Sequence, residues 1–160
     1  MRGIKKEIFI SFISIFVIFL LDRFTKEFII KLSNEELITQ IILSNFLSLN
    51  LVWNKGIAFG LFSIQNSNLY NSLTIFISIV IIIVFFLSIK ARGMEKLAYS
   101  FIVGGGIGNL YDRVVFKKVV DFIDFHINGL HWFIFNVADI FITLGIIFML
   151  SNEIYKSRIK

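Results

Sequence analysis

The sequence predicts an α-helical integral membrane protein with four transmembrane helices, a small extracytoplasmic β element and both termini in the cytoplasm. Three observations predict this fold class. Hydrophobic residues make up 57% of the 160 residues and charged residues only 17%, with a mean hydropathy of +0.84, whereas a soluble domain is about half apolar and about a quarter charged. The apolar residues gather in long runs, and the basic residues gather beside those runs. This composition excludes both a soluble globular domain and a disordered chain.

Four segments are long enough to cross a bilayer, which takes about 20 mostly apolar residues for roughly 30 Å of hydrocarbon. They are residues 8–30, 69–89, 95–113 and 133–152. The first is uncharged up to Leu21 and continues as a helix through Asp22, the second holds no charge, and the third is rich in glycine. The fourth is interrupted only by Asn136 and Asp139. We therefore expect residues 1–160 to form a single membrane-embedded domain.

The distribution of charge predicts the orientation of these spans. The N-terminal tail, the connection after the second span and the C-terminal tail together carry nine basic and three acidic residues and net +6. The remaining segments carry seven basic and eight acidic residues and net −1. Because basic residues stay on the cytoplasmic side of a membrane, this difference places both termini in the cytoplasm. The same placement of basic residues explains the formal charge of +5, so the charge does not indicate a nucleic-acid partner.

The two connections on the outer side are more than linkers. The connection from residue 31 to residue 68 is long for a loop. Within it, Leu47–Leu51 alternates apolar and polar residues, which is the pattern of a half-buried strand. Trp53–Gly60 then predicts a turn followed by a second short strand. The other connection, Lys117–Trp132, contains Val119–Asp124, which we assign to the same small β element.

Five acidic residues converge on the outer side of the predicted spans: Asp22, Asp112, Asp121, Asp124 and Asp139. A charge at the centre of a spanning helix costs about 2.5–3.5 kcal/mol. Asp139 lies six residues into the fourth span, about 9 Å below its outer end at 1.5 Å per residue, so it needs a partner, and Asp121 is the best-placed candidate. For Asp22, Asp112 and Asp124, ion pairing near the interface explains the sequence equally well.

A close pair of carboxyl groups can catalyse hydrolysis without a metal or a cysteine. Two such groups cannot easily both ionise, so the pKa of one rises and that acid keeps its proton near neutral pH. The ionised group can then activate water as a general base, while the protonated group donates to the scissile carbonyl. The residues alone leave open which of Asp121 and Asp139 holds the proton.

Other catalytic chemistries find little support in the sequence. It contains no cysteine, no His-Glu-x-x-His motif and no Gly-x-Ser-x-Gly motif. His126 and His131 are the two histidines, and we interpret them as surface residues of the outer loop. Gly104 and Gly108 form a Gly-x-x-x-Gly pair inside an apolar span, which indicates close helix packing rather than a phosphate-binding loop. We therefore expect no metal ion and no cofactor.

Five short motifs resemble, in order and over nearly the whole chain, those of the bacterial lipoprotein signal peptidases, also called signal peptidase II or prolipoprotein signal peptidase. Each motif alone has low specificity, but the five together in a four-span chain are highly specific. They are Asp22–Lys26 (DxxTK), Asn54–Gly60 (NxGxAF), Gly105–Arg113 (GxxGNxxDR), Val119–Phe122 (VVDF) and Phe135–Asp139 (FNxAD).

The resemblance implies four transmembrane helices and an outer β-cradle in the bacterial cytoplasmic (inner) membrane, with the active site near the extracytoplasmic leaflet. It implies an aspartic endopeptidase that removes the signal peptide from a prolipoprotein just before its diacylglyceryl-modified cysteine. Asp121 and Asp139 would be the catalytic aspartates. The residues that would shape and support the site are Asp22, Lys26, Asn54, Gly56, Asn109, Asp112, Arg113, Asn136 and Ala138. The implied partners are diacylated prolipoproteins and membrane lipid, and we expect a monomer.

Three other functions stay open on the residues alone. A small carrier or channel subunit would use the intramembrane acids to move protons, but this does not explain why the acids converge on one leaflet. A metal-dependent lipid phosphotransferase would use Asp121, Asp124 and His126, and activity in the presence of a strong chelator would count against it. A purely structural membrane subunit would show no turnover of a lipopeptide.

Overall fold

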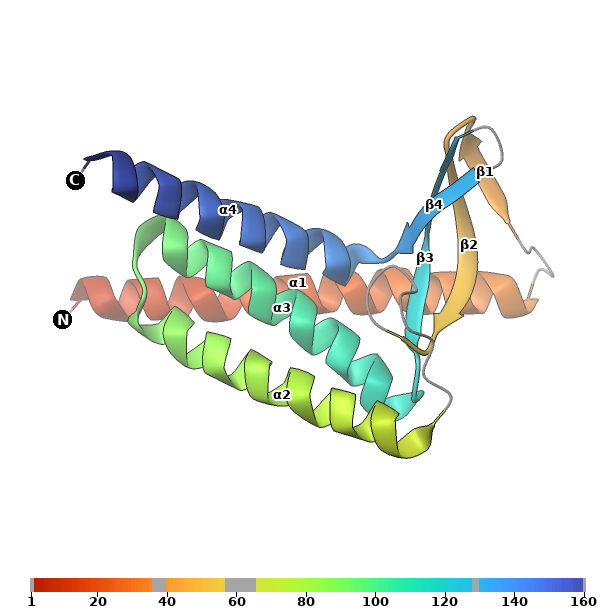
Figure 1. The fold of residues 1–160 in the computed structure, drawn as a ribbon, viewed down its shortest axis with the longest axis horizontal. Coiled ribbons are helices and arrows are strands. Elements are labelled where there is room, and N and C mark those ends of the chain that lie inside the picture. Colours follow the sequence, from red (N-terminus) through yellow and green to blue (C-terminus); the bar gives the residue numbers. More distant parts are fainter. Residues whose placement is uncertain (1, 36–39, 57–65, 128–129, 160) are drawn as a thin grey trace.

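A computed structural model describes residues 2–35, 40–56, 66–127 and 130–159. Its helices and strands follow the order α1 (Arg2–Glu35), β1 (Ile41–Ser44), β2 (Leu47–Asn54), α2 (Ser67–Lys90), α3 (Gly93–Val115), β3 (Val119–Ile127), β4 (Leu130–Phe135) and α4 (Val137–Ile159). The four helices form an elongated bundle, and the sheet lies across one end of it (Figure 1). The start of α1, the α2–α3 connection and the end of α4 lie together at the opposite end. The three basic segments of the sequence therefore share one end of the molecule.

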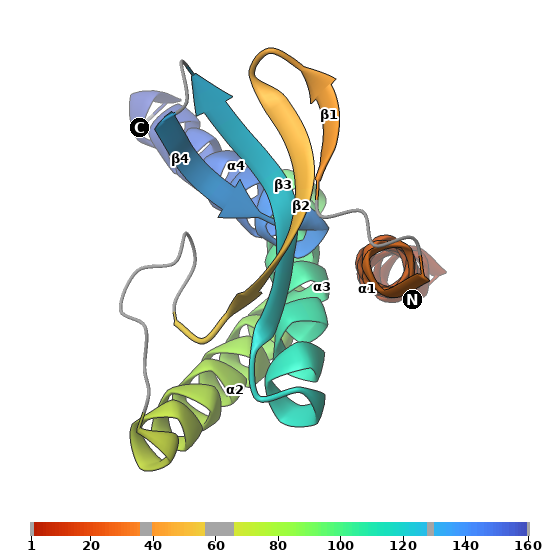
Figure 2. The same cartoon turned by 90° about the vertical axis from the view of Figure 1, so that its right-hand side faces the viewer.

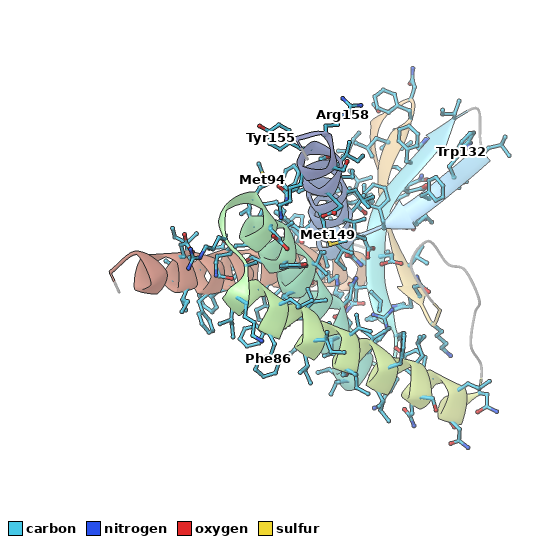
Figure 3. The ribbon with its side chains drawn as sticks, turned by 60° about the vertical axis from the view of Figure 1, so that its left-hand side comes forward. Phe86, Met94, Trp132, Met149, Tyr155 and Arg158 are labelled. Atoms are coloured by element: carbon cyan, nitrogen blue, oxygen red, sulfur yellow. The ribbon has the colours of Figure 1, made fainter. Side chains whose placement is uncertain are left out.

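Three of the helices are long and apolar enough to cross a membrane, over Glu7–Asn34, Ser67–Lys90 and Val137–Arg158. Large apolar side chains cover their outer surfaces. On α2, for example, Phe86 points away from the bundle (Figure 3) and is 59% exposed. An apolar surface of this extent is stable against lipid and unstable against water. The protein is therefore an integral membrane protein.

The third helix, α3, differs because it lies inside the bundle. It packs against α1, α2 and α4, which contact one another far less. Its 23 residues extend over about 34 Å at 1.5 Å per residue. Its glycines and the buried polar residues Asn109, Asp112 and Arg113 lower its hydropathy. The helix that is not among the three apolar spans is thus the one that the other three pack around.

The sheet has four antiparallel strands in the order β1–β2–β3–β4, and Figure 2 shows it across the end of the bundle. The alternating residues Leu47–Leu51 lie in β2, as predicted. The turn predicted within Trp53–Gly60 begins later than Trp53, because Val52–Asn54 continue β2 and pair with Val119–Asp121 of β3, and the chain turns at Asn54–Gly56. The strand predicted near residues 57–60 lies outside the described residues. The edge strand β1 is an element that the sequence did not predict.

The fourth helix begins later than predicted. We expected the span to begin at residue 133, but Phe133–Phe135 pair with β3 as part of β4, and α4 begins at Val137. Oδ1 of Asn136 accepts a hydrogen bond of 3.0 Å from the backbone N–H of Asp139, which is the geometry of a helix N-cap. Asp139 therefore lies in the first turn of α4, so its predicted depth of about 9 Å is wrong.

The close approach of α1 and α3 requires glycine at two positions. A Cβ atom at Gly104 would lie 2.9 Å from Cβ of Ile18, and a Cβ atom at Gly108 would lie 2.5 Å from Oδ2 of Asp22. Both distances are too short for a carbon atom in van der Waals contact. The structure thus confirms the packing role predicted for these two glycines.

Replacing either glycine by leucine should lower stability. In Gly104→Leu and Gly108→Leu, the new side chain must separate α1 from α3, and overpacking of this kind typically costs about 1–3 kcal/mol. We expect a lower thermal midpoint and a lower yield of folded protein in detergent. Val114→Leu, at an outward position of the same helix that is 56% exposed, is the matched control. Wild-type yield and thermal midpoint in Gly108→Leu would contradict the packing role.

Candidate active site

Asp121 and Asp139 come from different elements and meet at the end of the bundle that contacts the sheet. Asp121 is the third residue of β3, and Asp139 lies in the first turn of α4. The two residues are buried, with exposed fractions of 2% and 8%. Both line one cleft. The structure thus brings together the two carboxyl groups that the sequence paired.

Asn136 connects the two aspartates. Its Nδ2 donates a hydrogen bond of 2.6 Å to Oδ1 of Asp121. Its Oδ1 accepts from the backbone N–H of Asp139 at 3.0 Å, and its own backbone N–H donates to Oδ2 of Asp139 at 3.2 Å. This reciprocal pair of bonds is the arrangement of a capping box. Because Oδ1 is held by the helix end, Nδ2 is directed at Asp121, so one residue fixes the start of α4 and the orientation of both carboxyl groups.

Asn54, the last residue of β2, holds Asp121 from the neighbouring strand. Its Nδ2 donates to Oδ2 of Asp121 at 2.8 Å. Its Oδ1 accepts from the backbone N–H of Gly56 at 2.7 Å, which is an asparagine turn across two residues. The carbonyl of Gly56 in turn accepts from Nη2 of Arg113 at 3.4 Å. The Asn-x-Gly spacing of the sequence therefore serves to orient one amide group.

Asn109 of α3 performs the same role for Asp139. Its Nδ2 donates to Oδ1 of Asp139 at 2.8 Å. Its Oδ1 accepts from Nζ of Lys26 at 2.9 Å and from Nδ2 of Asn136 at 3.1 Å. These two donors fix the direction of the amide. Each of the two aspartates thus accepts a hydrogen bond from an asparagine whose own orientation is set by a third group.

Four charged residues form what we call the buried charge cluster: Asp22, Arg23 and Lys26 of α1 and Asp112 of α3. Nζ of Lys26 lies 3.0 Å from Oδ2 of Asp22 and 2.8 Å from Oδ2 of Asp112. Arg23 contacts the same two carboxylates, with Nη2 2.9 Å from Asp22 and Nη1 2.7 Å from Asp112. All four residues are buried. Two cations and two anions leave no net charge, which limits the cost of removing them from water.

The buried charge cluster also holds the main chain beside each candidate catalytic residue. Oδ1 of Asp22 accepts from the backbone N–H of Ala138 at 3.0 Å. Oδ2 of Asp112 accepts from the backbone N–H of Val120 at 3.2 Å. Ala138 and Val120 are the residues immediately before the two aspartates of the cleft. Each anion of the cluster therefore fixes one of these two backbone positions.

The cleft beside the aspartates has a volume of about 320 Å³. The residues that line it are the polar Asn54, Asn109, Arg113, Asp121, Asp139 and Thr143 and the apolar or small Ile77, Gly106, Val119, Ile142 and Ile146. Arg113 is buried and donates from Nη1 to the carbonyl of Asn109 at 3.2 Å. A cleft with this composition can accept a peptide segment with polar groups on one side and apolar side chains on the other.

The environment of Asp121 changes its acidity. Burial, and next the negative charge of Asp139, raise the pKa of Asp121 to about 7. The hydrogen bonds from Asn54 and Asn136 and the positive charge of Lys26 act in the opposite direction. A carboxyl group with this pKa can hold or release a proton near neutral pH, which is what general acid–base catalysis requires.

Asp124, His126 and His131 lie apart from this cleft. The interpretation of the two histidines as loop residues is wrong, because His126 belongs to β3 and His131 to β4. Side chains alternate between the two faces of a strand, so Asp121 and Asp124, three residues apart, lie on opposite faces. The set of Asp121, Asp124 and His126, which a metal-dependent phosphotransferase would require, is therefore not formed.

Arg23 is a residue of the network that the sequence reasoning missed. Its guanidinium contacts both anions of the buried charge cluster and lies 4.6 Å from the ring centre of Tyr111. The sequence held a signal for it, because an arginine inside an apolar span costs about 2.5–3.5 kcal/mol unless it finds a partner. Its partners are the adjacent Asp22 and Asp112, which lies far along the chain.

Comparisons with known proteins identify the family of this chain. The family model described as signal peptidase (SPase) II matches residues 14–155 of this chain. A lipoprotein signal peptidase of Pelagibacter ubique (strain HTCC1062) is 47% identical over 150 residues, which cover 94% of this chain and 90% of the relative. A lipoprotein signal peptidase of Anaplasma phagocytophilum (strain HZ) is 40% identical over 152 residues, which cover 92% of this chain and 93% of the relative.

Two solved structures, both described as bacterial membrane enzymes, share the fold. One superposes with a TM-score of 0.79 at 26% identity and covers 94% of this chain and 90% of its own. The other has a TM-score of 0.70 at 28% identity and covers 89% of this chain and 90% of its own. The family match includes the helices and strands that supply every residue of the cleft. The chain belongs to the signal peptidase II family of membrane proteases.

Proposed function

We propose that this chain removes the signal peptide from diacylglyceryl-modified prolipoproteins, cutting just before the lipidated cysteine, with Asp121 and Asp139 as an aspartic catalytic pair. Family membership supports the substrate class, because the curated relatives are named lipoprotein signal peptidases. One observation supports the pair, namely that Asn136 hydrogen-bonds both aspartates. Asn136 holds the carboxyl group of Asp121 through its side-chain amide and that of Asp139 through its backbone N–H, which keeps the two groups at a fixed separation.

In the proposed mechanism the pair holds one proton. The ionised carboxylate takes a proton from a water molecule while the water oxygen attacks the carbonyl carbon of the scissile bond. The protonated carboxyl group donates its proton to the carbonyl oxygen, where negative charge develops. When the tetrahedral intermediate collapses, the C–N bond breaks and the amine leaves with the proton that came from water. The proton on the former carbonyl oxygen returns to the carboxylate that donated it, so the pair again holds one proton. The pKa of about 7 makes Asp121 the better candidate for the protonated partner.

The other predicted site residues divide into two groups in this proposal. Asn54, Asn109 and Arg113 line the cleft and are placed to contact the substrate main chain. The remainder act through other groups, as positioning residues: Asp22, Lys26, Gly56, Asp112, Asn136 and Ala138. Holding the reacting groups in one geometry avoids the entropy cost of assembling them at each turnover.

The cleft also fits a substrate that stays in the membrane. Its apolar lining residues include Ile77 of α2 and Ile142 and Ile146 of α4, two helices that are apolar enough to face lipid. A lipid-modified peptide could therefore place its signal helix against these side chains while its main chain meets the aspartates. Contacts of the diacylglyceryl group with lipid-facing apolar side chains would help to position the scissile bond, so we expect diacylated prolipoprotein to be cleaved and the unmodified form to be a poor substrate.

We further propose that α3 is a fourth transmembrane span and that both termini are cytoplasmic in the bacterial inner membrane. The charge of +6 on the three basic segments supports this orientation, which puts the cleft near the extracytoplasmic leaflet. Reporter fusions at Lys160 and within residues 117–127 should therefore report opposite sides. The aspartates and the amides that orient them belong to one chain, so a single membrane-embedded domain, acting as a monomer, supplies the whole proposed site.

Both aspartates should be indispensable. Asp121→Asn and Asp139→Asn keep the side-chain shape and remove the ionisable group, so we expect each to fold and to lose cleavage by about 10²–10⁴-fold. The double variant should be little worse than either single one, because residues that act as a unit are not additive. The assay is the appearance of the shortened product from diacylated prolipoprotein, with the thermal midpoint of each variant as a check on folding.

Asp124→Asn is the matched control for these variants. Its carboxyl group is buried like that of Asp121 but lies on the other face of β3, so cleavage should persist. A chelator should also leave the activity of the folded protein intact, because no step of the mechanism uses a metal. Robust turnover by Asp121→Asn or Asp139→Asn would refute the pair.

The pH dependence of cleavage should be bell-shaped, with its alkaline limb near pH 7. Below its pKa of about 7, Asp121 is protonated and can donate to the carbonyl oxygen, whereas above it the group is ionised and cannot. The rate should therefore fall as pH rises through 7, and it should fall again in acid when the base becomes protonated. Both limbs belong to the coupled pair. A rate that stays constant up to pH 9, with the protein still folded, would contradict this assignment.

A further inference from the structure

We propose that Asp124, His126 and His131 bind a divalent transition-metal ion such as Zn²⁺, on the face of the sheet opposite Asp121. One ligand atom from each of the three residues lies within 4.8 Å of the other two. The site is separate from the catalytic pair, so its existence does not depend on the proposed protease mechanism.

The register of the strands brings the three side chains together. Asp124 and His126 are two residues apart on β3, so they project from the same face of the sheet. His131 of β4 is the cross-strand partner of His126, and directly paired residues of antiparallel strands project from the same face. Figure 2 shows β3 and β4 side by side. Two neighbouring strands thus supply all three ligands.

The carboxylate of Asp124 is buried and held in one orientation. Its side chain is fully inaccessible. Nδ1 of His131 lies 2.9 and 2.7 Å from its two oxygens. Oγ of Ser48 donates to Oδ2 of Asp124 at 3.3 Å, and Nε2 of Gln40 donates to that same Oγ at 2.9 Å. Hydrogen bonds behind a ligand orient carboxylates in metal sites in this way, and a buried carboxylate is stabilised by a cation.

The two histidines differ in burial and in hydrogen bonding. Nδ1 of His126 is buried and has no hydrogen-bond partner among the residues that the structure describes. A buried polar atom without a partner destabilises a protein, and one ring nitrogen of His126 lies within reach of an ion shared with the other two residues. The ring of His131 lies 5.3 Å from that of His126, centre to centre, and the His131 side chain is 50% exposed. An ion could therefore enter from solution on the side of His131.

The donor set indicates the kind of metal. Two imidazoles and one carboxylate suit Zn²⁺ and its first-row neighbours Co²⁺, Ni²⁺ and Cu²⁺. Mg²⁺ and Ca²⁺ prefer sites made of oxygen ligands alone. A bound ion would join β4 to β3, and β4 leads through Asn136 into α4. The expected role is therefore to stabilise the sheet that carries Asp121.

Metal binding is tested on the full chain purified in detergent without a polyhistidine tag, because the chain has only two histidines of its own. We expect Zn²⁺ to bind at one ion per chain in equilibrium dialysis. Binding to the folded state should raise the thermal midpoint with increasing Zn²⁺ concentration. Co²⁺ should give visible absorption bands of a site with nitrogen and oxygen ligands, and Zn²⁺ should displace it.

Substitution of the histidines identifies the site. His126→Gln and His131→Gln should each weaken Zn²⁺ binding by more than about tenfold and abolish the rise in thermal midpoint. Asp139→Asn, on the cleft side, is the control and should bind Zn²⁺ like the wild type. Unchanged binding in both histidine variants would overturn the proposal. If a variant fails to fold, the wild-type chain is the deciding test. Absence of stoichiometric Zn²⁺ binding and of Co²⁺ bands would overturn the proposal and leave Asp124 and His131 as an acid–imidazole pair without a metal.

Discussion

The structure depends on the buried charge cluster of Asp22, Arg23, Lys26 and Asp112. Four charges can be buried in a helix bundle of the membrane because each lies within 3.0 Å of an opposite charge and the sum is zero. The low dielectric constant of the protein interior strengthens these attractions, but it also makes an unpaired charge costly. Removing one partner of such a group typically costs about 3–5 kcal/mol, because the remaining charge stays buried. The neutrality of the cluster is therefore a condition for the packing of α1 against α3.

The buried charge cluster also positions the groups that line the cleft. Its two carboxylates hold the backbone N–H groups just before the two aspartates, and Lys26 orients Asn109, which holds Asp139. Asn136 closes the network between the aspartates. Motifs that are far apart in the sequence thus form one hydrogen-bonded unit. This unit explains why polar residues recur at one end of spans that are otherwise apolar.

The sequence contained enough information for the class of the fold, the pairing of Asp121 with Asp139 in one cleft, and most residues around them. Hydropathy identifies the apolar segments that must avoid water. The motifs identify the polar residues that must avoid lipid. The errors concern the sheet and its junction with α4. The apolar residues before Asn136 resemble the start of a span, but backbone pairing with β3 makes them a strand. Arg23 and the grouping of Asp124 with both histidines depend on contacts between distant segments, and no local pattern encodes those contacts.

The most direct test of this account is a double-mutant cycle on Arg23 and Asp112, with thermal stability and cleavage measured for all four proteins. Arg23→Met and Asp112→Asn each leave one uncompensated charge, so each should lower the thermal midpoint and the cleavage rate. The double variant leaves Asp22 paired with Lys26 and restores neutrality. We therefore predict that it is more stable than either single variant and recovers part of the cleavage lost in Arg23→Met. Additive losses, with the double variant the least stable of the four, would contradict the claim that a neutral buried cluster holds the proposed catalytic pair in place.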